Sequence, residues 1–245
     1  MQATKLEFAR ALERLTLGGA APKRPVEAEL LPTGWPELDE LLSGGLPRGR
    51  LIELRGVASS GKTALAFATA ARASAAGQLV AWIDATGELH PPSAAQAGVE
   101  LARLLVVRPP RTPLAAARAA EILARARIFA LVVLDLPAAL PDRAAARLRI
   151  AARDAGAALL VIGGEAPHAA LRLAIAPQAP QAERGEHETD RRGLSVTVLK
   201  GSATGARAEV TLGRPALTRT FHSPEALQAL GVASPTAAAR AEPGA

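Results

Sequence analysis

The sequence contains no cysteine and no tyrosine, and aromatic residues make up only 2% of its 245 residues. Without cysteine the chain forms neither a disulfide nor a thiolate metal site, and its four histidines lack the spacing of metal ligands. The scarcity of aromatic rings argues against a platform that stacks the bases of single-stranded nucleic acid. A core of Leu, Val, Ile and Ala instead suits a parallel sheet covered by helices.

Long apolar runs are also missing. No run approaches the roughly 18 residues that a membrane-spanning helix needs. The first ten residues, MQATKLEFAR, lack the basic-then-apolar layout of a secretory signal. We therefore expect a soluble, cytoplasmic protein without a membrane partner.

Lysine is scarce as well, because only four of the 29 basic residues are lysines. The formal net charge of +6 favours a polyanionic partner such as nucleic acid. The excess of Arg, together with Ala, Gly and Pro, is equally what codon bias produces in a GC-rich genome. Charge alone therefore leaves a DNA surface and a compositional origin open.

The pattern along the chain predicts an arm, a core and a tail. Apolar residues recur at helical spacing over residues 6–17, before Gly18 and Gly19, so residues 1–30 are predicted to be a helical arm and linker. The arm packs on its own core or on a neighbouring copy, and the linker favours the neighbour. We expect one α/β core over residues 31–217 and a disordered tail over residues 218–245.

Within the predicted core, apolar runs typical of strands alternate with alanine-rich runs typical of helices. The strand candidates are residues 51–56, 79–85, 129–136 and 158–164, and the helix candidates are residues 63–77, 115–127 and 143–156. This alternation predicts βαβ units in a mostly parallel sheet flanked by helices. Residues 194–201 and 206–213 predict a C-terminal β-hairpin added to the edge of that sheet.

The stretch GVASSGKT, from Gly56 to Thr63, fits the phosphate-loop pattern G-x-x-x-x-G-K-[ST] and lies between a strand candidate and a helix candidate. In such a loop Lys62 reaches the nucleotide phosphates and Thr63 binds Mg²⁺. Backbone amides complete the anion site. The residues expected to supply those amides are Gly56, Ser59, Ser60 and Gly61.

Carboxylates that complete such a site are expected where neighbouring strands end. Asp135 ends the apolar run FALVVLD and is the candidate second ligand of Mg²⁺, although it could also merely cap the segment before Pro137. Asp84 ends the run LVAWID, and Glu88 lies just beyond it. Either Glu88 or Asp84 could orient an attacking water, and Glu88 could equally be a solvated loop residue.

Several of these motifs keep one order and spacing. The run LPTGWPELDELLSGGLPRGRLIELRGVASSGKTALAF, followed by AWIDATGELHPPSAAQAGVEL, resembles the RecA family of recombinases. The resemblance is nearly continuous from Thr33 to Pro109, is patchy through Asp135 and is faint after Gly164. It implies a RecA-like P-loop ATPase core that uses ATP and Mg²⁺, with Lys62, Glu88 and Asp135 as candidate catalytic residues.

The sequence departs from the recombinase pattern at several functional positions. Thr86 stands where the family has the Glu that activates water, and Gly163 and Gly164 stand in place of its γ-phosphate sensor. The segments that correspond to the DNA-binding loops are short. Of the two lysines that reach a neighbour's ATP in the family, Lys200 remains and Ser202 occupies the second place. Full recombinase activity is therefore the least favoured interpretation.

A RecA-like core with these departures, an N-terminal arm and a polar tail resembles the ImuA group, accessory proteins of the bacterial translesion-synthesis cassette (mutasome). That resemblance implies a role in the SOS response and DNA repair, with DNA, a polymerase-type protein such as ImuB, and RecA as partners. A second interpretation is a non-hydrolysing adaptor in which bound ATP only stabilises the fold, and the substitution at Thr86 supports it.

Arginines supply the candidate DNA contacts. Arg143, Arg147 and Arg153, with Arg149 nearby, fall at helical spacing and could bind the phosphate backbone or simply form a solvated helix face. Arg184, Arg191 and Arg192 flank a polar segment and could replace part of a lost DNA loop. Loops of such composition are usually only solvated.

Overall fold

The computed structural model of the chain describes residues 30–178 and 192–212. The predicted arm, the polar segment before residue 192 and the predicted tail lie outside the described residues. No helix in the described ranges is long and apolar enough to cross a membrane.

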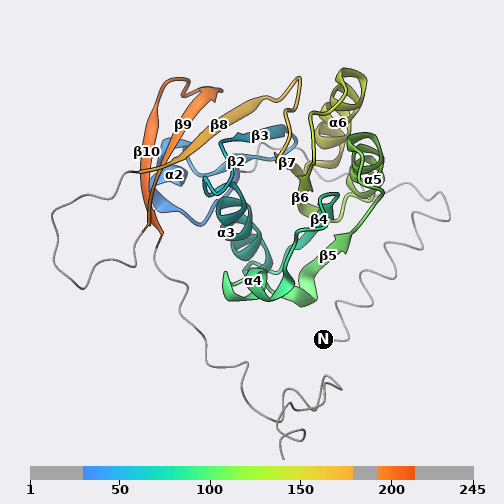
Figure 1. Ribbon diagram of the computed structural model, residues 1–245, viewed down its shortest axis with the longest axis horizontal. Helices are drawn as coiled ribbons and strands as arrows, with labels where there is room; N and C mark the ends of the chain where they lie inside the picture. The colour runs from blue at the N-terminus through green and yellow to red at the C-terminus, as the bar shows by residue number, and fades with distance from the viewer. Residues whose placement is uncertain (1–29, 179–191, 213–245) are drawn as a thin grey trace, which may run out of the picture. The chain divides into compact units, whose positions relative to one another are not determined.

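An eight-stranded sheet with the order β10-β9-β8-β3-β7-β6-β4-β5 forms the centre of the molecule (Figure 1). Six strands run parallel and the last two form an antiparallel hairpin at one edge. The parallel strands are β3 (Leu51–Arg55), β4 (Leu79–Asp84), β5 (Leu104–Val107), β6 (Phe129–Asp135), β7 (Ala158–Ile162) and β8 (Leu171–Pro177), and the hairpin is β9 (Arg192–Lys200) and β10 (Arg207–Leu212). The predicted α/β fold class, with its C-terminal hairpin, is confirmed.

Helices cover both faces of this sheet. On one face lies α3 (Lys62–Ala75), whose buried residues Ala66, Ala70 and Ala73 let it approach the strands closely. The other face is covered by α5 (Pro113–Arg125) and α6 (Asp142–Ala155), which lie side by side in Figure 1. Two apolar cores therefore share one sheet.

The remaining elements are short. They are the two-stranded sheet of β1 (Leu30–Leu31) and β2 (Leu46–Pro47), the helices α2 (Pro36–Leu41) and α4 (Pro91–Gln96), and the 3-10 helix η1 (Leu101–Arg103). Both short α-helices begin at a proline, which suits the first helical turn because its missing N–H has no partner there.

The small sheet of β1 and β2 was not predicted, and neither were two strands of the eight-stranded sheet, β5 and β8. β5 has only four residues, all half-buried, at the sheet edge. In β8 the buried residues Leu171, Leu173 and Ile175 alternate with less buried ones, the first of which is the polar Arg172. A search for long apolar runs overlooks both strands, although β8 is the strand that pairs with the hairpin.

Candidate functional site

The loop between β3 and α3 turns tightly against the neighbouring strands. Gly56 has φ +156°, and a Cβ there would lie 2.3 Å from Ser60 Oγ and 2.4 Å from the carbonyl oxygen of Ile175 in β8. Gly61 has φ +102°, and a Cβ there would lie 2.5 Å from Cδ1 of Leu194 in β9. Both positions need glycine, because residues of β8 and β9 lie too close to the loop to leave room for a side chain.

Lys62 is the first residue of α3, and its side chain folds over this loop. Its Nζ donates to the carbonyl oxygens of Gly56 (2.7 Å) and Val57 (2.6 Å) and to Ser60 Oγ (3.3 Å). Burial lowers the pKa of the ammonium group, and the negative charge of Asp135 partly opposes this shift. The lysine is therefore a preorganised positive charge at the centre of the loop.

The rest of the motif fits a phosphate group. Ser59 adopts a left-handed conformation with φ +59°, and Ser60 is fully buried. Thr63 lies exposed in the first turn of α3. The opening N–H groups of a helix have no intrahelical partner and carry the positive end of its dipole. Loop, lysine and helix end thus form an anion site.

Two aspartates face this anion site from the same edge of the sheet. Asp84 ends β4 and Asp135 ends β6, and the two residues are paired in register on adjacent parallel strands. Burial raises the pKa of Asp135 to about 6, together with the charges of Asp84 and Glu88, whereas a hydrogen bond from Thr86 and the charge of Lys62 act in the opposite direction. Asp135 is an unfavourably placed carboxylate that a cation would stabilise.

Asp84 organises the loop that follows β4. Its Oδ1 accepts hydrogen bonds from the Thr86 hydroxyl (3.2 Å) and from the backbone N–H groups of Gly87 (2.8 Å) and Glu88 (3.0 Å). Its Oδ2 accepts from Nε of Arg108 at 2.8 Å. Burial of Asp84 acts to raise its pKa, but the hydrogen bonds, led by that from Arg108, outweigh burial and hold the pKa below its usual value.

Arg108 is the site residue that the sequence reasoning missed. It directly follows β5, the short edge strand that was not predicted, and also donates to the carbonyl oxygen of Leu89 (3.2 Å). The sequence feature that could have identified Arg108 is its place directly after the apolar run LLVV. Such residues gather at the carboxyl edge of a parallel sheet.

The structure thus places the residues predicted for the nucleotide and metal site together at the carboxyl edge of the sheet. Lys62 and Asp135 are close enough to shift each other's pKa. Glu88 is exposed, and its charge acts on Asp135. Thr86 is half-buried, and its hydroxyl hydrogen-bonds to the carboxylate of Asp84 and also lies beside Asp135.

The segments after β6 and β7, residues 136–141 and 163–170, are short and contain no Lys or Arg. They pack against each other, because a Cβ at Gly163 would lie 2.4 Å from the carbonyl oxygen of Leu136, and one at Gly164 would lie 2.2 Å from that of Ala138. Both glycines therefore have a packing role at the place where the family has its phosphate sensor.

The arginines proposed to contact DNA differ in their surroundings. Arg147 forms an ion pair with Glu121 of α5, and Arg153 forms one with Asp154 at 3.4 Å. Arg143 and Arg149 are exposed and make no ion pair with residues that the structure describes. Arg184, Arg191 and the side chain of Arg192 lie outside the described part.

Lys200 is the last residue of β9 and is paired with Arg172 of β8. It lies six residues along the strand from Leu194, which contacts the phosphate loop, and the exposed Ser202 lies two residues beyond it.

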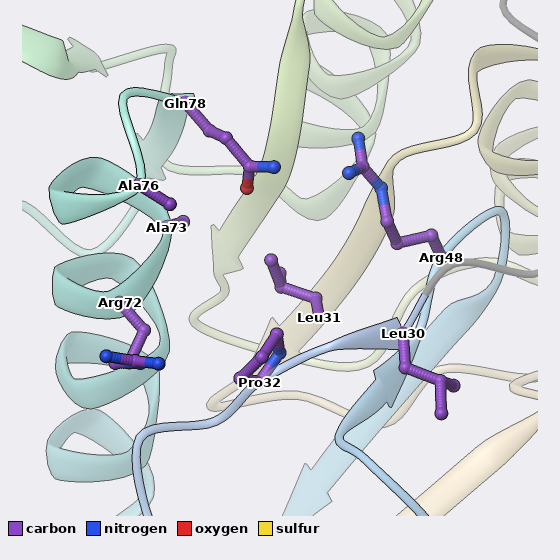
Figure 2. Close-up of a pocket in the computed structure, with 8 residues that line it drawn as sticks. All are labelled: Leu30, Leu31, Pro32, Arg48, Arg72, Ala73, Ala76 and Gln78. Carbon is purple, nitrogen blue, oxygen red and sulfur yellow. The ribbon is translucent and has the colours of Figure 1, made fainter.

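A pocket of about 310 Å³ lies at the other end of α3 (Figure 2). Its lining side chains come from β1, from the segment before β3 and from the last turn of α3. Because α3 has 14 residues and each adds about 1.5 Å, this pocket lies about 20 Å from the phosphate loop. It is separate from the candidate nucleotide site.

Comparison with known proteins agrees with this geometry. A model of the RecA N-terminal domain family matches residues 11–159. RecA from Frankia casuarinae is 44% identical over 127 residues, 51% of this chain and 36% of that protein. RecA from Mesorhizobium japonicum is 43% identical over 125 residues, 51% of this chain and 34% of that protein. The chain thus spans about a third of the length of the curated relatives it matches.

Among solved structures, the crystal structure of the RadB recombinase superposes with a TM-score of 0.58 and 21% sequence identity, covering 74% of this chain and 94% of that chain. At this identity the likeness shows the fold alone. The family model covers more than half of the sequence, and it includes the phosphate loop and both aspartates that end strands. The chain therefore belongs to the RecA family.

Proposed function

We propose that the chain is a RecA-like, Mg²⁺-dependent ATPase of modest rate that acts in the cytoplasm as an accessory factor in DNA damage tolerance. The observation that carries the proposal is the meeting of Lys62, Asp84 and Asp135 at the N-terminal end of α3. A glycine-rich loop with a half-buried lysine and an opposing carboxylate is suited to a nucleoside triphosphate.

Each residue at this edge has a distinct proposed role. Lys62 and the amides of residues 56–61 would hold the phosphates, and Thr63 and Asp135 would hold Mg²⁺. The cation, when bound, neutralises phosphate charge. Glu88 is the candidate to orient water, because its backbone is fixed by Asp84 while its side chain is exposed. Thr86 carries no carboxylate, which supports a modest rate.

A specific observation also supports the adaptor alternative. The Thr86 hydroxyl, which hydrogen-bonds to Asp84, is too weakly basic to activate water, and Glu88 lies two residues beyond the expected position. In that case ATP would stabilise the fold or switch partner binding without being hydrolysed. The two functions share the same nucleotide site and differ only in turnover.

The accessory role, rather than strand exchange, is supported by the segments after β6 and β7. The resemblance assigns DNA-binding loops to these places, and here they are short and carry no Lys or Arg. We therefore favour an ImuA-like protein that contacts the DNA backbone through arginines elsewhere and works beside an ImuB-type polymerase homologue and RecA. Co-elution of the purified chain with such a polymerase homologue tests this part of the proposal, and separate elution contradicts it.

The first experiment is phosphate release from MgATP, with and without single-stranded DNA, by the wild-type chain, Lys62→Ala and Glu88→Gln. Binding of a fluorescent ATP analogue is measured in parallel. Turnover that disappears in Lys62→Ala and falls about 100-fold in Glu88→Gln supports the ATPase with Glu88 as the water-orienting residue. Nucleotide binding without turnover selects the adaptor. A wild-type chain that binds no nucleotide overturns both.

A further inference from the structure

The outer face of α5 carries exposed apolar side chains at helical spacing. Leu114, Arg118 and Ile122 lie at positions i, i+4 and i+8 and therefore share one side of the helix. Leu114 is 47% exposed and Ile122 is 56% exposed. Two large apolar side chains two turns apart, with Arg118 between them, form a stripe rather than an isolated surface residue.

The neighbouring helix adds two arginines and one exposed apolar side chain at similar spacing. In α6, Arg143, Arg147 and Ile150 lie at positions i, i+4 and i+7, and Ile150 is 45% exposed. Glu121 of α5 accepts from both Arg125 of its own helix and Arg147 of α6. The helices α5 and α6 lie side by side (Figure 1), and the Glu121–Arg147 pair crosses from one to the other, so we treat their outer faces as one surface.

The charge of this surface is strongly positive. The two helices carry six arginines and three acidic residues, and the acidic residues are already paired: Glu121 with two arginines, Asp154 with Arg153, and Asp142 with His168. Arg118 and Arg143 make no ion pair with the residues that the structure describes. The surface therefore has unpaired basic groups beside apolar ones.

We propose that this α5–α6 surface binds an acidic amphipathic helix of a partner protein. The surface is defined by Leu114, Arg118, Ile122, Arg143, Arg147 and Ile150. Leu114 and Ile122 are eight residues apart, about 12 Å along the helix, which matches two turns of a partner helix. The apolar groups would contact its apolar face, and the arginines would pair with flanking carboxylates.

Two other occupants fit less well. A DNA backbone would pair with the arginines but would leave Leu114, Ile122 and Ile150 in water. The chain's own first 29 residues, offered by a second copy, carry five basic and four acidic side chains and so lack the complementary charge. The proposal adds a surface to the accessory role but does not depend on ATP turnover, so it can fail independently of the ATPase.

The test uses a display library of helical peptides of about four turns. Leucines are fixed along one face, and the other positions are drawn from Glu, Lys, Ala and Gln. Selection is carried out on the full chain. We expect Glu to exceed Lys at the positions that flank the leucines, and the selected peptides to bind about tenfold more weakly to Ile122→Asp and to Arg118→Glu.

Matched variants separate this surface from the rest of the molecule. Leu199→Asp, at a side chain that is 44% exposed on β9, serves as the control and should leave peptide binding unchanged. A peptide in which Lys replaces Glu should recover binding to Arg118→Glu. Equal enrichment of Lys and Glu, or binding that is insensitive to Ile122→Asp, would overturn the proposal.

The competing occupants are measured directly. The first competitor is a synthetic peptide of residues 1–29. If this peptide binds the wild-type chain but not Ile122→Asp, the surface is assigned to a second copy and the proposal is overturned. The second competitor is a single-stranded oligonucleotide. If its binding is lost in Arg118→Glu but kept in Ile122→Asp, the surface is assigned to DNA and the proposal is likewise overturned. If neither the peptide nor the oligonucleotide binds in this way, the result supports the acidic helix.

Discussion

At the scale of single residues, Asp135 is the group whose ionisation the fold disfavours most clearly. Its pKa is raised to about 6 by burial and by the neighbouring charges of Asp84 and Glu88. The folded chain therefore binds more protons than the unfolded chain between about pH 4 and about pH 6. The stability of the metal-free protein consequently falls as the pH rises through this window.

Asp135→Asn should therefore stabilise the metal-free protein above pH 6, because it removes the charge and keeps the shape. We expect a gain on the order of 2 kcal/mol in the free energy of unfolding at pH 8, and no gain at pH 4. Urea unfolding in EDTA at both pH values measures it, with the exposed Asp154→Asn as control. Equal effects at pH 4 and pH 8 would contradict this electrostatic account.

The ion pair of Asp84 with Arg108 gives a second prediction at this scale. The side chain of Asp84 is fully buried, whereas that of Arg108 is 57% exposed. Arg108→Ala leaves a buried carboxylate without its cation, so we expect a loss of about 1–3 kcal/mol at pH 7, discounted for the exposure of the arginine.

The double variant tests the cause of that loss. In an Asp84→Asn background, Arg108→Ala should cost about 0.5 kcal/mol or less, because the buried charge has already been removed. The remaining cost reflects the hydrogen bond from Arg108 to Leu89. Chemical unfolding of all four chains completes the cycle. If the two backgrounds lose the same stability, Arg108 does not act through Asp84.

At the scale of elements, the hairpin of β9 and β10 packs against the phosphate loop and supports it. Leu194 of β9 contacts Gly61, and Val198 of the same strand packs into the same core four residues further on. Both side chains are buried, at 4% and 1% exposure. The two positions therefore make a matched pair that differs in contact with the loop.

We expect Leu194→Ala to cost about 2–4 kcal/mol of stability and Val198→Ala about 1–3 kcal/mol. Only Leu194→Ala should weaken binding of a fluorescent ATP analogue, by about fivefold or more, because the loop loses its support. Titrations at a temperature where both variants stay folded measure this. Equal affinities for the two variants would show that the hairpin contributes stability but does not shape the loop.

The elements also show how far sequence reasoning reaches. β3, the loop and α3 were predicted because the apolar run, the glycine motif and the helical pattern are all local signals. β5 was missed because an apolar run of only four residues is too short to stand out as a strand, and Arg108 was missed with it.

Contacts between residues far apart in the sequence were the second feature that the sequence analysis did not predict. Glu53 in the apolar run LIEL is fully buried, and its partners are Arg55 and Arg172, the latter 119 residues away. The register of β8 beside β3 brings Glu53 and Arg172 together, and no local pattern encodes that register. The pairing of Arg147 with Glu121 of another helix escaped prediction for the same reason.

At the scale of the whole molecule, one sheet joins two apolar cores. Leu65 of α3 belongs to one and Leu148 of α6 to the other, and both are almost fully buried. Trp35 and Trp82 both lie in the core on the α3 side, and the chain has no tyrosine. Tryptophan fluorescence therefore reports directly on one core only.

Because every strand from β3 to β6 faces both cores, we expect them to unfold as a single cooperative unit. Leu148→Ala, in the core without tryptophan, should lower the stability measured by tryptophan fluorescence by about 2–5 kcal/mol, and Leu65→Ala should have an effect of similar size. Circular dichroism should give the same midpoint as fluorescence for each variant. If Leu148→Ala moves the circular dichroism transition and leaves the fluorescence transition at the wild-type midpoint, the α5–α6 layer unfolds separately from the layer that carries the phosphate loop.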